Sequence, residues 1–364
     1  MIKILYYLRA LNVGGAETFI YNVLDKIDIS ECHIDIVLQT TENKNHQLLG
    51  LCNAKGVRIF YTDTFEEHFI KSYRQLLSIV RENSYDAIHL HANSLINNIP
   101  ILVSRKTKCL LVVHSHNSSN NVGGIIGKTI HYFHRWIMNK GNVTRLSCSD
   151  KAGKWMFGDK PYTIINNGIN LDRFKYDAKS RKQLRLELRI TDNTIVWGHV
   201  GRFVRAKNHT FLIKCFEEYN KTCPNSKLVL LGDGPLFDQV RNSTQNKNIL
   251  FLGSISNTSK YYSLFDLMVF PSLFEGLPFV LVEAQAAGLP ILASDNITKL
   301  VNVTGLIEYF DLDNCEKNWC LKVASMLEGN DRGCYYKIMI NSIFDSETTI
   351  KQLYEFYRNK NTNK

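Results

Sequence analysis

Short apolar runs alternate with helical stretches along the whole chain. This alternation is typical of βαβ units, in which parallel strands are covered by helices on both faces. A first series of apolar runs predicts strands at 2–8, 33–39, 57–61, 86–90, 109–113, 145–147 and 162–165. A second series predicts strands at 194–201, 226–232, 248–253, 266–271 and 289–294. Two such series predict two parallel sheets, and therefore two α/β domains with a cleft between them.

A polar segment with little periodicity, 165–177, separates the two series and predicts a linker near 166–176. In the tail, apolar residues recur at helical spacing and predict a helix over 348–360 with one apolar face, formed by Ile350, Leu353, Tyr354 and Tyr357. We therefore expect an N-terminal domain over 1–168, a C-terminal domain over 169–344 and a terminal segment over 345–364.

Length and composition favour a folded, two-domain protein. The chain has 364 residues, of which 45% are hydrophobic and 21% charged, and one hydrophobic core rarely serves so long a chain. No apolar run is long enough to span a membrane, and the N-terminus lacks a cleavable signal pattern, so we expect a cytoplasmic protein. The nine cysteines form no C-x-x-C pair, which favours reduced core residues over a disulfide framework or a zinc knuckle.

The positive charge is unevenly distributed. The net charge is +10, and residues 101–160 hold ten Lys and Arg side chains against only Asp150 and Asp159. Within this stretch, 127–141 interleaves basic and aromatic residues, as an amphipathic helix lying on an anionic membrane surface does. A domain helix with a solvated basic face explains the same pattern. No nucleic-acid-binding motif accompanies the charge, so we expect no nucleic-acid partner.

The segment 270–295 contains the most specific candidate chemistry. Its pattern predicts a strand ending at Pro271, then a loop, then a helix that begins at Pro278 and runs to about Ala287. The helix N-terminus would open at the carboxyl end of a strand, where α/β sheets bind ligands. Free backbone N–H groups and the helix dipole make such a site suitable for a diphosphate.

Two glutamates flank this predicted helix start. Glu275 and Glu283 lie eight positions apart, up to ~12 Å at helical rise, so each carboxylate suits the hydroxyls of one sugar ring of a nucleotide sugar. The alternative is a loop charge and a solvated helix residue. The otherwise apolar surroundings of Glu283 favour a partner for it.

Basic residues follow the first strand of the second series. Arg202, Arg205 and Lys207 would lie together at the carboxyl end of that strand, where they could neutralise a departing diphosphate without a metal. A strand followed by basic residues is also common without such a role.

The remaining candidates are a glycine turn and two pairs of histidines. Gly14 and Gly15 permit close approach to a ligand, but they do not form a nicotinamide-binding fingerprint. The segment 123–129 lacks the glycine spacing of a phosphate-binding P-loop. Of the histidines at 89, 91, 114 and 116, we expect His114 to donate a hydrogen bond to the substrate and the others to satisfy loop backbone groups. No metal is expected, because the acidic pair Asp311 and Asp313 lies far along the chain.

These segments together resemble the retaining glycosyltransferases of family four, which have the GT-B fold, especially the bacterial capsule, exopolysaccharide and O-antigen members. The resemblance spans nearly the whole chain. It rests on VGGAE at 13–17, HSHN at 114–117, AGKWMFG at 152–158, NNGIN at 166–170, VGRFVRAKN at 200–208, GDGP at 232–235 and EGLPFVLVEAQAAGLP at 275–290. It implies two Rossmann-like domains facing each other across a cleft, with the acceptor on the N-terminal domain and the nucleotide sugar on the C-terminal one.

The resemblance also implies roles for individual residues. Glu275 would contact the transferred sugar and Glu283 the ribose, while Arg202 and Lys207 would bind the diphosphate. The remaining donor contacts would come from the backbone of Gly276, Leu277 and Pro278, from the turn at Gly14 and Gly15, and from His114 near the reacting carbon. The last helix would return to the first domain. Two positions depart from the family pattern, Ser115 and Asn170, where relatives often carry aspartate.

The expected function is retaining transfer of a hexose or N-acetylhexosamine from a nucleotide diphosphate sugar, with a UDP-sugar as first choice. The acceptor would be a hydroxyl of a growing surface polysaccharide linked to a polyprenyl diphosphate, and no metal cofactor would be needed. The enzyme would work in the cytoplasm or at the inner face of the membrane. Two alternatives remain open: a nucleotide-sugar 2-epimerase of GT-B fold, and a non-catalytic partner subunit of another glycosyltransferase.

Overall fold

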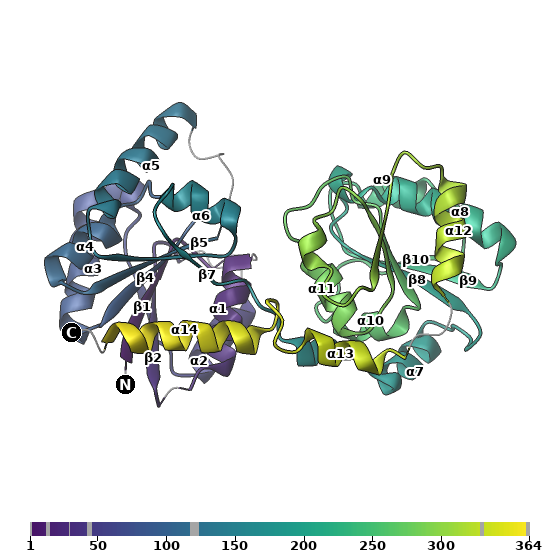
Figure 1. Ribbon diagram of the computed structural model, residues 1–364, viewed down its shortest axis with the longest axis horizontal. Helices are drawn as coiled ribbons and strands as arrows, with labels where there is room; N and C mark the ends of the chain where they lie inside the picture. The colour runs from purple at the N-terminus through teal and green to yellow at the C-terminus, as the bar shows by residue number, and fades with distance from the viewer. Residues whose placement is uncertain are drawn as a thin grey trace. The chain divides into compact units, whose positions relative to one another are not determined.

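The computed structural model describes residues 2–11, 15–28, 30–41, 46–116, 124–327 and 331–361. The chain divides into two compact units (Figure 1). Unit 1 consists of Met1–Ile169 together with Ser346–Lys364, and unit 2 of Asn170–Asp345. The first boundary lies within the segment predicted as a linker.

Unit 1 contains a seven-stranded parallel sheet in the order β3-β2-β1-β4-β5-β6-β7. Its strands are β1 (Ile2–Leu8), β2 (Cys32–Leu38), β3 (Ile59–Tyr61), β4 (Ala87–Ala92), β5 (Leu110–Ser115), β6 (Val143–Ser147) and β7 (Thr163–Ile164). Its helices are α1 (Gly15–Lys26), α2 (His46–Ala54), α3 (Phe65–Asn83), α4 (Ile99–Thr107), α5 (Gly124–Asn139), α6 (Asp150–Phe157) and α14 (Ser346–Asn361). All seven strands of the first predicted series are present.

Alternate residues of β1 enter two separate cores, one on each face of this sheet. Ile4 and Tyr6 belong to one cluster, and Leu5 and Tyr7 to the other. Because both faces are covered, residues 4–8 of this strand form a continuous apolar run rather than an alternating one, and Lys3 near the strand's start is its only charged residue. Full burial of each large apolar side chain contributes roughly 1.5–3 kcal/mol.

The last helix of the chain, α14, packs on unit 1. Ile350, Leu353 and Tyr357 are buried in the cluster that contains Tyr6. The Tyr357 hydroxyl lies 3.4 Å from that of Tyr6 and hydrogen-bonds Nδ1 of His89. The apolar face predicted over 348–360 is therefore the surface that holds the C-terminal helix against the first sheet.

Unit 2 contains a six-stranded parallel sheet in the order β10-β9-β8-β11-β12-β13. Its strands are β8 (Ile195–Val200), β9 (Ser226–Leu231), β10 (Ile249–Phe251), β11 (Leu267–Phe270), β12 (Ile291–Ser294) and β13 (Ile307–Phe310). Its helices are α7 (Ala178–Glu187), α8 (His209–Thr222), α9 (Phe237–Asn242), α10 (Ser259–Leu264), α11 (Phe279–Ala286), α12 (Glu316–Met326) and α13 (Gly333–Met339), with 3₁₀ turns at Leu171–Phe174, Arg205–Lys207 and Lys299–Val301. The sequence prediction missed β13, because this short edge strand is only partly buried and contains Glu308.

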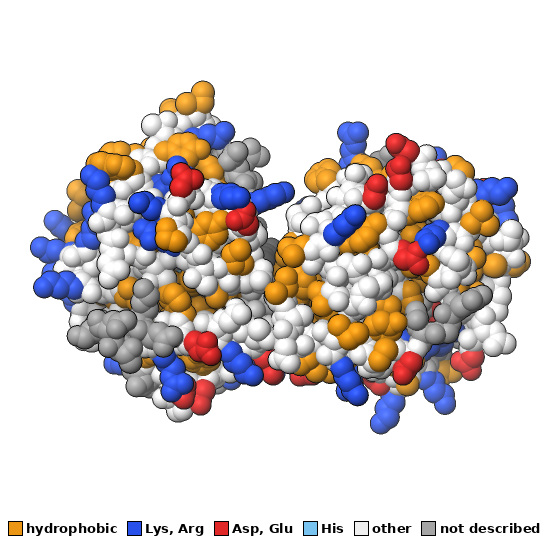
Figure 2. Space-filling model, in the orientation of Figure 1, with side chains coloured by type: hydrophobic (Ala, Val, Ile, Leu, Met, Phe, Trp, Pro, Cys, Tyr) orange, Lys and Arg blue, Asp and Glu red, His pale blue; other side chains and the backbone are white. Residues whose placement is uncertain are grey.

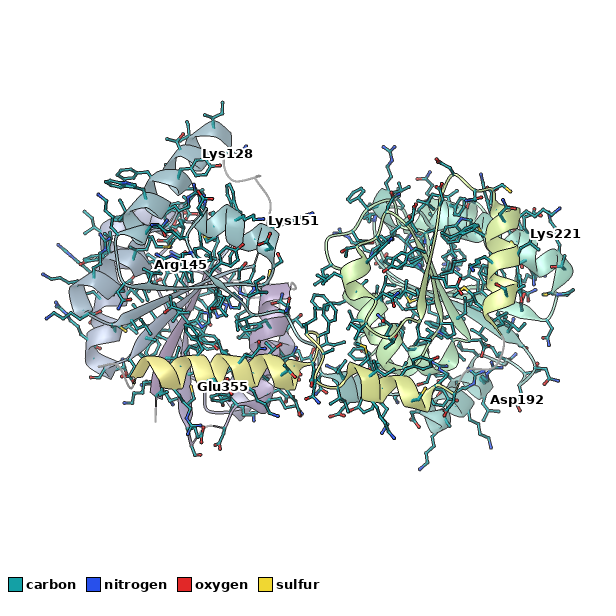
Figure 3. All side chains as sticks on the ribbon, viewed as in Figure 1. Lys128, Arg145, Lys151, Asp192, Lys221 and Glu355 are labelled. Carbon is teal, nitrogen blue, oxygen red and sulfur yellow. The ribbon has the colours of Figure 1, made fainter. Side chains whose placement is uncertain are left out.

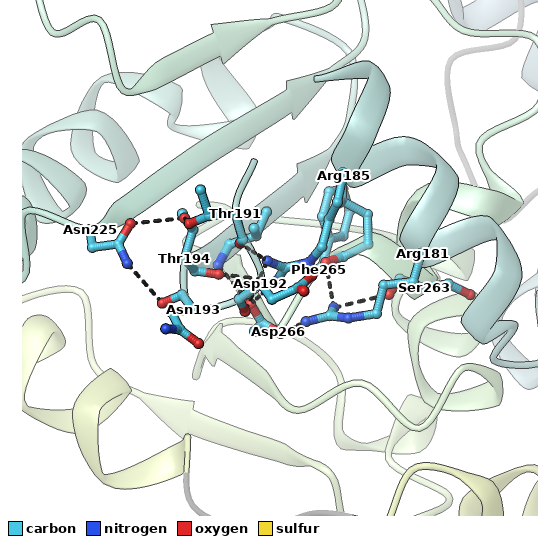
Figure 4. A network of polar contacts seen from close by, with 12 residues as sticks. Arg181, Arg185, Thr191, Asp192, Asn193, Thr194, Asn225, Ser263, Phe265 and Asp266 are labelled. Atoms are coloured by element: carbon cyan, nitrogen blue, oxygen red, sulfur yellow. Dashed lines mark hydrogen bonds and ion pairs between the residues drawn. The ribbon is translucent and has the colours of Figure 1, made fainter. Parts of the chain in front are cut away.

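A polar network ties α7 to the amino ends of β8 and β11 (Figure 4). Asp266 accepts hydrogen bonds from the backbone N–H of Val196 at 2.8 Å, from Arg181 at 2.6 Å and from Arg185 at 3.1 Å. The Arg185 side chain is only 4% exposed, so its charge depends on this partner. The network fixes this edge of the sheet, and the loops at the opposite edge carry the candidate site.

The structure also bears on the predictions for the cysteines and for membrane-spanning segments. All nine cysteines are free, but Cys315 and Cys334 are exposed, so the prediction that all cysteines are core residues is wrong for these two. They lie at the start of α12 and in α13, outside the apolar faces of those helices. Across the described ranges, no helix combines the length and apolar character needed to cross a membrane.

Candidate functional site

The site in unit 2 lies where the strand order of its sheet reverses. β8 and β11 are neighbours, and the chain continues from β8 to β9 on one side and from β11 to β12 on the other. The loops that follow β8 and β11 therefore leave the sheet together, and a backbone hydrogen bond from Leu273 N to Ala206 O, 2.8 Å long, joins them. Ligands of open α/β sheets bind at such switch points.

These two loops bring Lys207 and Glu275 into an ion pair. Lys207 Nζ lies 2.7 Å from Glu275 Oε1, and the two side chains are 15% and 14% exposed. The ammonium group also lies 4.7 Å from the centre of the Phe270 ring. Sequence reasoning assigned Lys207 to a phosphate and Glu275 to a sugar, and it did not predict that they pair with each other.

Arg202 lines an open pocket of about 460 Å³ at the carboxyl ends of β8, β9 and β10. The loops after β8 and β9 interlock there, with Phe203 N donating to Asp233 O at 3.0 Å. Gly232 has a φ of +133°, and a Cβ at this position would lie 2.0 Å from Gly201 O. Only glycine permits this approach. The pocket is completed by Val200, Leu231, Gly234, Ser254, Ile255 and Thr258.

Helix α11 begins directly after Pro278, which is its N-cap residue, and Gly288 follows its end with a φ of +63°. Glu283 lies in the second turn of α11, where it is half-buried and accepts a hydrogen bond from the hydroxyl of Tyr262. Burial raises the pKa of the Glu283 carboxyl, and the Tyr262 hydrogen bond opposes that rise. Tyr262 was missed at the sequence level, because its segment shows no pattern beyond a short amphipathic helix.

His114 lies in unit 1, at the carboxyl end of β5. It is fully buried, with its ring centre 4.9 Å from that of Phe19. On the same strand end, His116 is partly exposed. The predicted contact of His114 with a donor sugar stays a prediction.

The four histidines of β4 and β5 form one cluster, since the two strands pair with His91 opposite His114. His91 Nδ1 lies 2.9 Å from His116 Nε2, and His89 bonds Tyr357. The expectation that His89, His91 and His116 satisfy loop backbone groups is therefore wrong, because the side chain of His89 bonds Tyr357 and those of His91 and His116 bond each other. Burial lowers the pKa of each well below 6.5, so the rings are neutral at pH 7.

In the described part of the chain, one group of side chains has ligand atoms close enough together to hold a metal ion. Ligand atoms of His89, His91 and His114 all lie within 4.8 Å of one another. The acidic pair Asp311 and Asp313 is exposed in unit 2, whereas these histidines belong to unit 1.

The other predicted site residues are placed as follows. Gly14 lies outside the described residues, and Gly15 is the first residue of α1. Arg202, Lys207, Glu275 and Glu283 all belong to unit 2.

Comparison with known proteins covers both units. Residues 13–173 match the family described as "Glycosyltransferase Family 4", and residues 180–304 match "Glycosyl transferases group 1". The putative glycosyltransferase EpsF of Bacillus subtilis is 31% identical over 339 residues, which cover 88% of this chain and 87% of EpsF. An Escherichia coli enzyme, UDP-Gal:alpha-D-GlcNAc-diphosphoundecaprenol alpha-1,3-galactosyltransferase, is 25% identical over 262 residues, covering 66% of this chain and 67% of that enzyme.

A solved structure shares the fold. The crystal structure of HepE from Anabaena in complex with UDP superposes with a TM-score of 0.76 at 17% identity, covering 99% of this chain and 100% of HepE. The two parallel-sheet, Rossmann-like units are those of the GT-B fold. The chain belongs to the family-four glycosyltransferases, and it is a transferase of that family.

Proposed function

We propose that this chain is a retaining glycosyltransferase that moves a hexose or N-acetylhexosamine from a UDP-sugar to a hydroxyl of a growing bacterial surface polysaccharide, without a metal ion. The observation that carries the proposal is the convergence of Arg202, the Lys207–Glu275 pair and the start of α11 at one edge of the unit 2 sheet. That edge offers both cations for a diphosphate and carboxylates for sugar hydroxyls.

Each group at this edge has a chemical task in the proposal. Arg202 and Lys207, with the backbone N–H groups at Gly276, Leu277 and Pro278–Phe279, stabilise the negative charge that grows on the leaving diphosphate. Proline itself has no N–H, so the donors there come from its neighbours. Glu275 accepts hydrogen bonds from hydroxyls of the transferred sugar, and Glu283 accepts them from the ribose.

The stereochemistry follows from the face on which the acceptor attacks, and no protein nucleophile is required. The acceptor hydroxyl attacks the anomeric carbon from the face that the diphosphate leaves, so the configuration is retained. The departing diphosphate takes the hydroxyl proton, and its own negative charge balances the positive charge on the sugar ring. Positioned cations replace the metal that other diphosphate-releasing sites use.

The pocket beside Arg202 supports a nucleotide donor. It is bounded by residues from three strand ends, and its volume of about 460 Å³ lies within the range of small-ligand pockets. UDP is bound by HepE, the solved protein of similar fold, and a UDP-sugar is named for the Escherichia coli relative. The same relative's name specifies a diphosphoundecaprenol-linked acceptor, which supports a lipid-linked glycan as the acceptor here.

The first experiment incubates pure protein with a panel of nucleotide sugars, with EDTA present, and measures release of nucleoside diphosphate with and without lipid-linked acceptors. We expect one UDP-sugar to be turned over, and chelation to leave the rate unchanged. Conversion of the donor into an epimer without acceptor would indicate the 2-epimerase instead. Failure of every donor to bind would favour a partner subunit.

We further propose that α5 holds the enzyme on an anionic membrane surface at the inner face of the membrane. Large apolar side chains on α5 are exposed, among them Ile125 at 85%, Ile126 at 75% and Trp136 at 56%. Lys140 Nζ lies 3.4 Å from the Trp136 ring centre, and residues 124–140 contain no acidic side chain. Figure 2 shows orange apolar and blue basic atoms together over α5, and Figure 3 labels Lys128 on this helix. Such a face suits the boundary between lipid headgroups and acyl chains.

Binding to phosphatidylglycerol vesicles tests this proposal. We expect Lys128→Ala to weaken vesicle binding about five-fold, since each basic residue near an anionic surface contributes ~1 kcal/mol. Trp136→Ala should weaken it further through lost apolar contact. The controls are Lys221→Ala and Leu186→Ala, which remove an exposed lysine and an exposed leucine in unit 2. Equal binding to neutral phosphatidylcholine vesicles, or equal loss in the controls, would leave α5 as a solvated helix.

A further inference from the structure

Tyr262 contacts the Glu283 carboxylate from the buried side. It lies on α10 and is fully buried, and its hydroxyl donates to Glu283 Oε2. Its ring packs edge-on against Phe174, with centres 5.8 Å apart. Arg332 donates to its backbone oxygen at 2.6 Å. The tyrosine is thus fixed through both its ring and its backbone.

This contact occupies only one oxygen of the carboxylate. Oε2 accepts from Tyr262, while no partner among the described residues is seen for Oε1. Glu283 is half-buried, whereas Tyr262 has no exposed surface. A ligand at this edge of the sheet therefore reaches Glu283 but not Tyr262. Because the hydrogen bond to Tyr262 restricts the Glu283 side chain to one rotamer, the second carboxylate oxygen points in one direction.

We propose that Tyr262 is a positioning residue that aims Glu283 at the ribose, and that the pair makes this enzyme select ribonucleotide donors over 2′-deoxyribonucleotide donors such as thymidine diphosphate sugars. The inference rests on the proposed function, in which Glu283 binds the ribose hydroxyls. Beyond that function, the enzyme would bind 2′-deoxyribonucleotide donors weakly, and Tyr262 would be the residue responsible.

The physical reason for rejection is an unpaired acceptor. A ribose presents two vicinal hydroxyls to the carboxylate, and a 2′-deoxyribose presents only one. A half-buried carboxylate that receives one hydrogen-bond donor in place of two on ligand binding keeps part of its desolvation penalty without compensation. A fixed carboxylate cannot turn to find water or another donor. A carboxylate freed from Tyr262 can, so the penalty for the missing hydroxyl falls.

The test compares the Kd values of UDP and 2′-deoxy-UDP for three proteins. For the wild type we expect 2′-deoxy-UDP to bind roughly 10- to 100-fold more weakly, the range that an unsatisfied acceptor costs. For Tyr262→Phe, which keeps the ring and removes the hydroxyl, we expect this ratio to fall to within about three-fold of unity. Tyr261→Phe, the neighbouring tyrosine on α10, should keep the wild-type ratio.

Kinetics and pH give readouts that a packing role would not change. Tyr262→Phe should raise the donor KM and largely spare kcat, because the ribose lies away from the reacting carbon. Burial raises the pKa of Glu283, while the Tyr262 hydrogen bond and the positive charge of Arg173 lower it. Because the variant loses the hydrogen bond and keeps Arg173, its carboxyl should be protonated at higher pH. UDP affinity of the variant should therefore be lost at a higher pH than that of the wild type as pH falls.

Different outcomes refute the donor site and the role of Tyr262. Absence of any UDP binding by the wild type would refute the proposed donor site itself. UDP binding without discrimination by the wild type would overturn the inference even if Tyr262→Phe failed to fold. An unchanged ratio in folded Tyr262→Phe would show that the tyrosine only packs.

Discussion

Replacing Lys207 with alanine is expected to lower kcat by about 100- to 1000-fold, the usual cost of removing one preorganised charge or donor from a developing anion. Lys207 is one of two cations that the proposal places on the leaving diphosphate, and it is only 15% exposed. Because the site is largely shielded from solvent, water in the alanine variant compensates poorly for the missing ammonium group. The measurement is the initial rate of nucleoside diphosphate release at saturating donor and acceptor.

Lys221→Ala is the matched control for this variant. Lys221 also pairs with a glutamate, Glu218, but both side chains lie at the surface of α8. Its replacement should leave kcat unchanged. A Lys207→Ala enzyme that retained turnover within a few-fold of the wild type would mean that the diphosphate leaves without this cation.

Replacing Glu275 with alanine is expected to lower kcat/KM by about 100-fold, through loss of hydrogen bonds to the transferred sugar that tighten in the transition state. A second effect comes from the pair seen in the structure, because Lys207 loses the carboxylate that lies 2.7 Å from its Nζ. The ammonium group is then free to adopt other positions. Glu275→Gln keeps a hydrogen-bond acceptor but removes the negative charge. The fall in kcat/KM of this variant therefore measures the contribution of the charge.

A double-mutant cycle on Lys207 and Glu275 tests whether the two act as a unit. We expect the double alanine variant to lose much less than the product of the two single losses, since neighbours that share one site couple by roughly 0.5–3 kcal/mol. The same cycle on the exposed pair Lys221 and Glu218 should be additive and without effect on activity. Fully additive losses at Lys207 and Glu275 would contradict the coupling.

Much of the fold could be predicted from the chain because both sheets are parallel and buried. Strands covered on both faces are largely apolar, so β11 is an uninterrupted apolar run, β1 is interrupted only by Lys3, and β8 only by Gly198 and His199. Edge strand β13 does not obey this rule, since only one of its residues is fully buried. The apolar face of α14 predicted a packed helix, and the family resemblance, not that face, implied that the helix returns to the first domain.

The candidate site was predicted unevenly, and the histidines show why. Each pair was visible as a motif, but their meeting depends on β4 lying beside β5, which is a property of sheet order. Burial of His114 likewise depends on Phe19, nearly a hundred positions earlier in the chain. Motif reasoning assigns a residue type to a task and does not determine whether the side chain reaches solvent.

By itself, the sequence determined the two parallel sheets, the helix that starts after Pro278, the position of Arg202, Lys207 and Glu275 in loops that follow strands, and the position of Glu283 in that helix, because these follow from local periodicity and turn chemistry. Only the tertiary structure decided that Lys207 pairs with Glu275, that Tyr262 donates a hydrogen bond to Glu283 and that four histidines lie side by side. Those contacts join residues from different strands and helices, and their distances depend on how the elements pack rather than on their spacing along the chain.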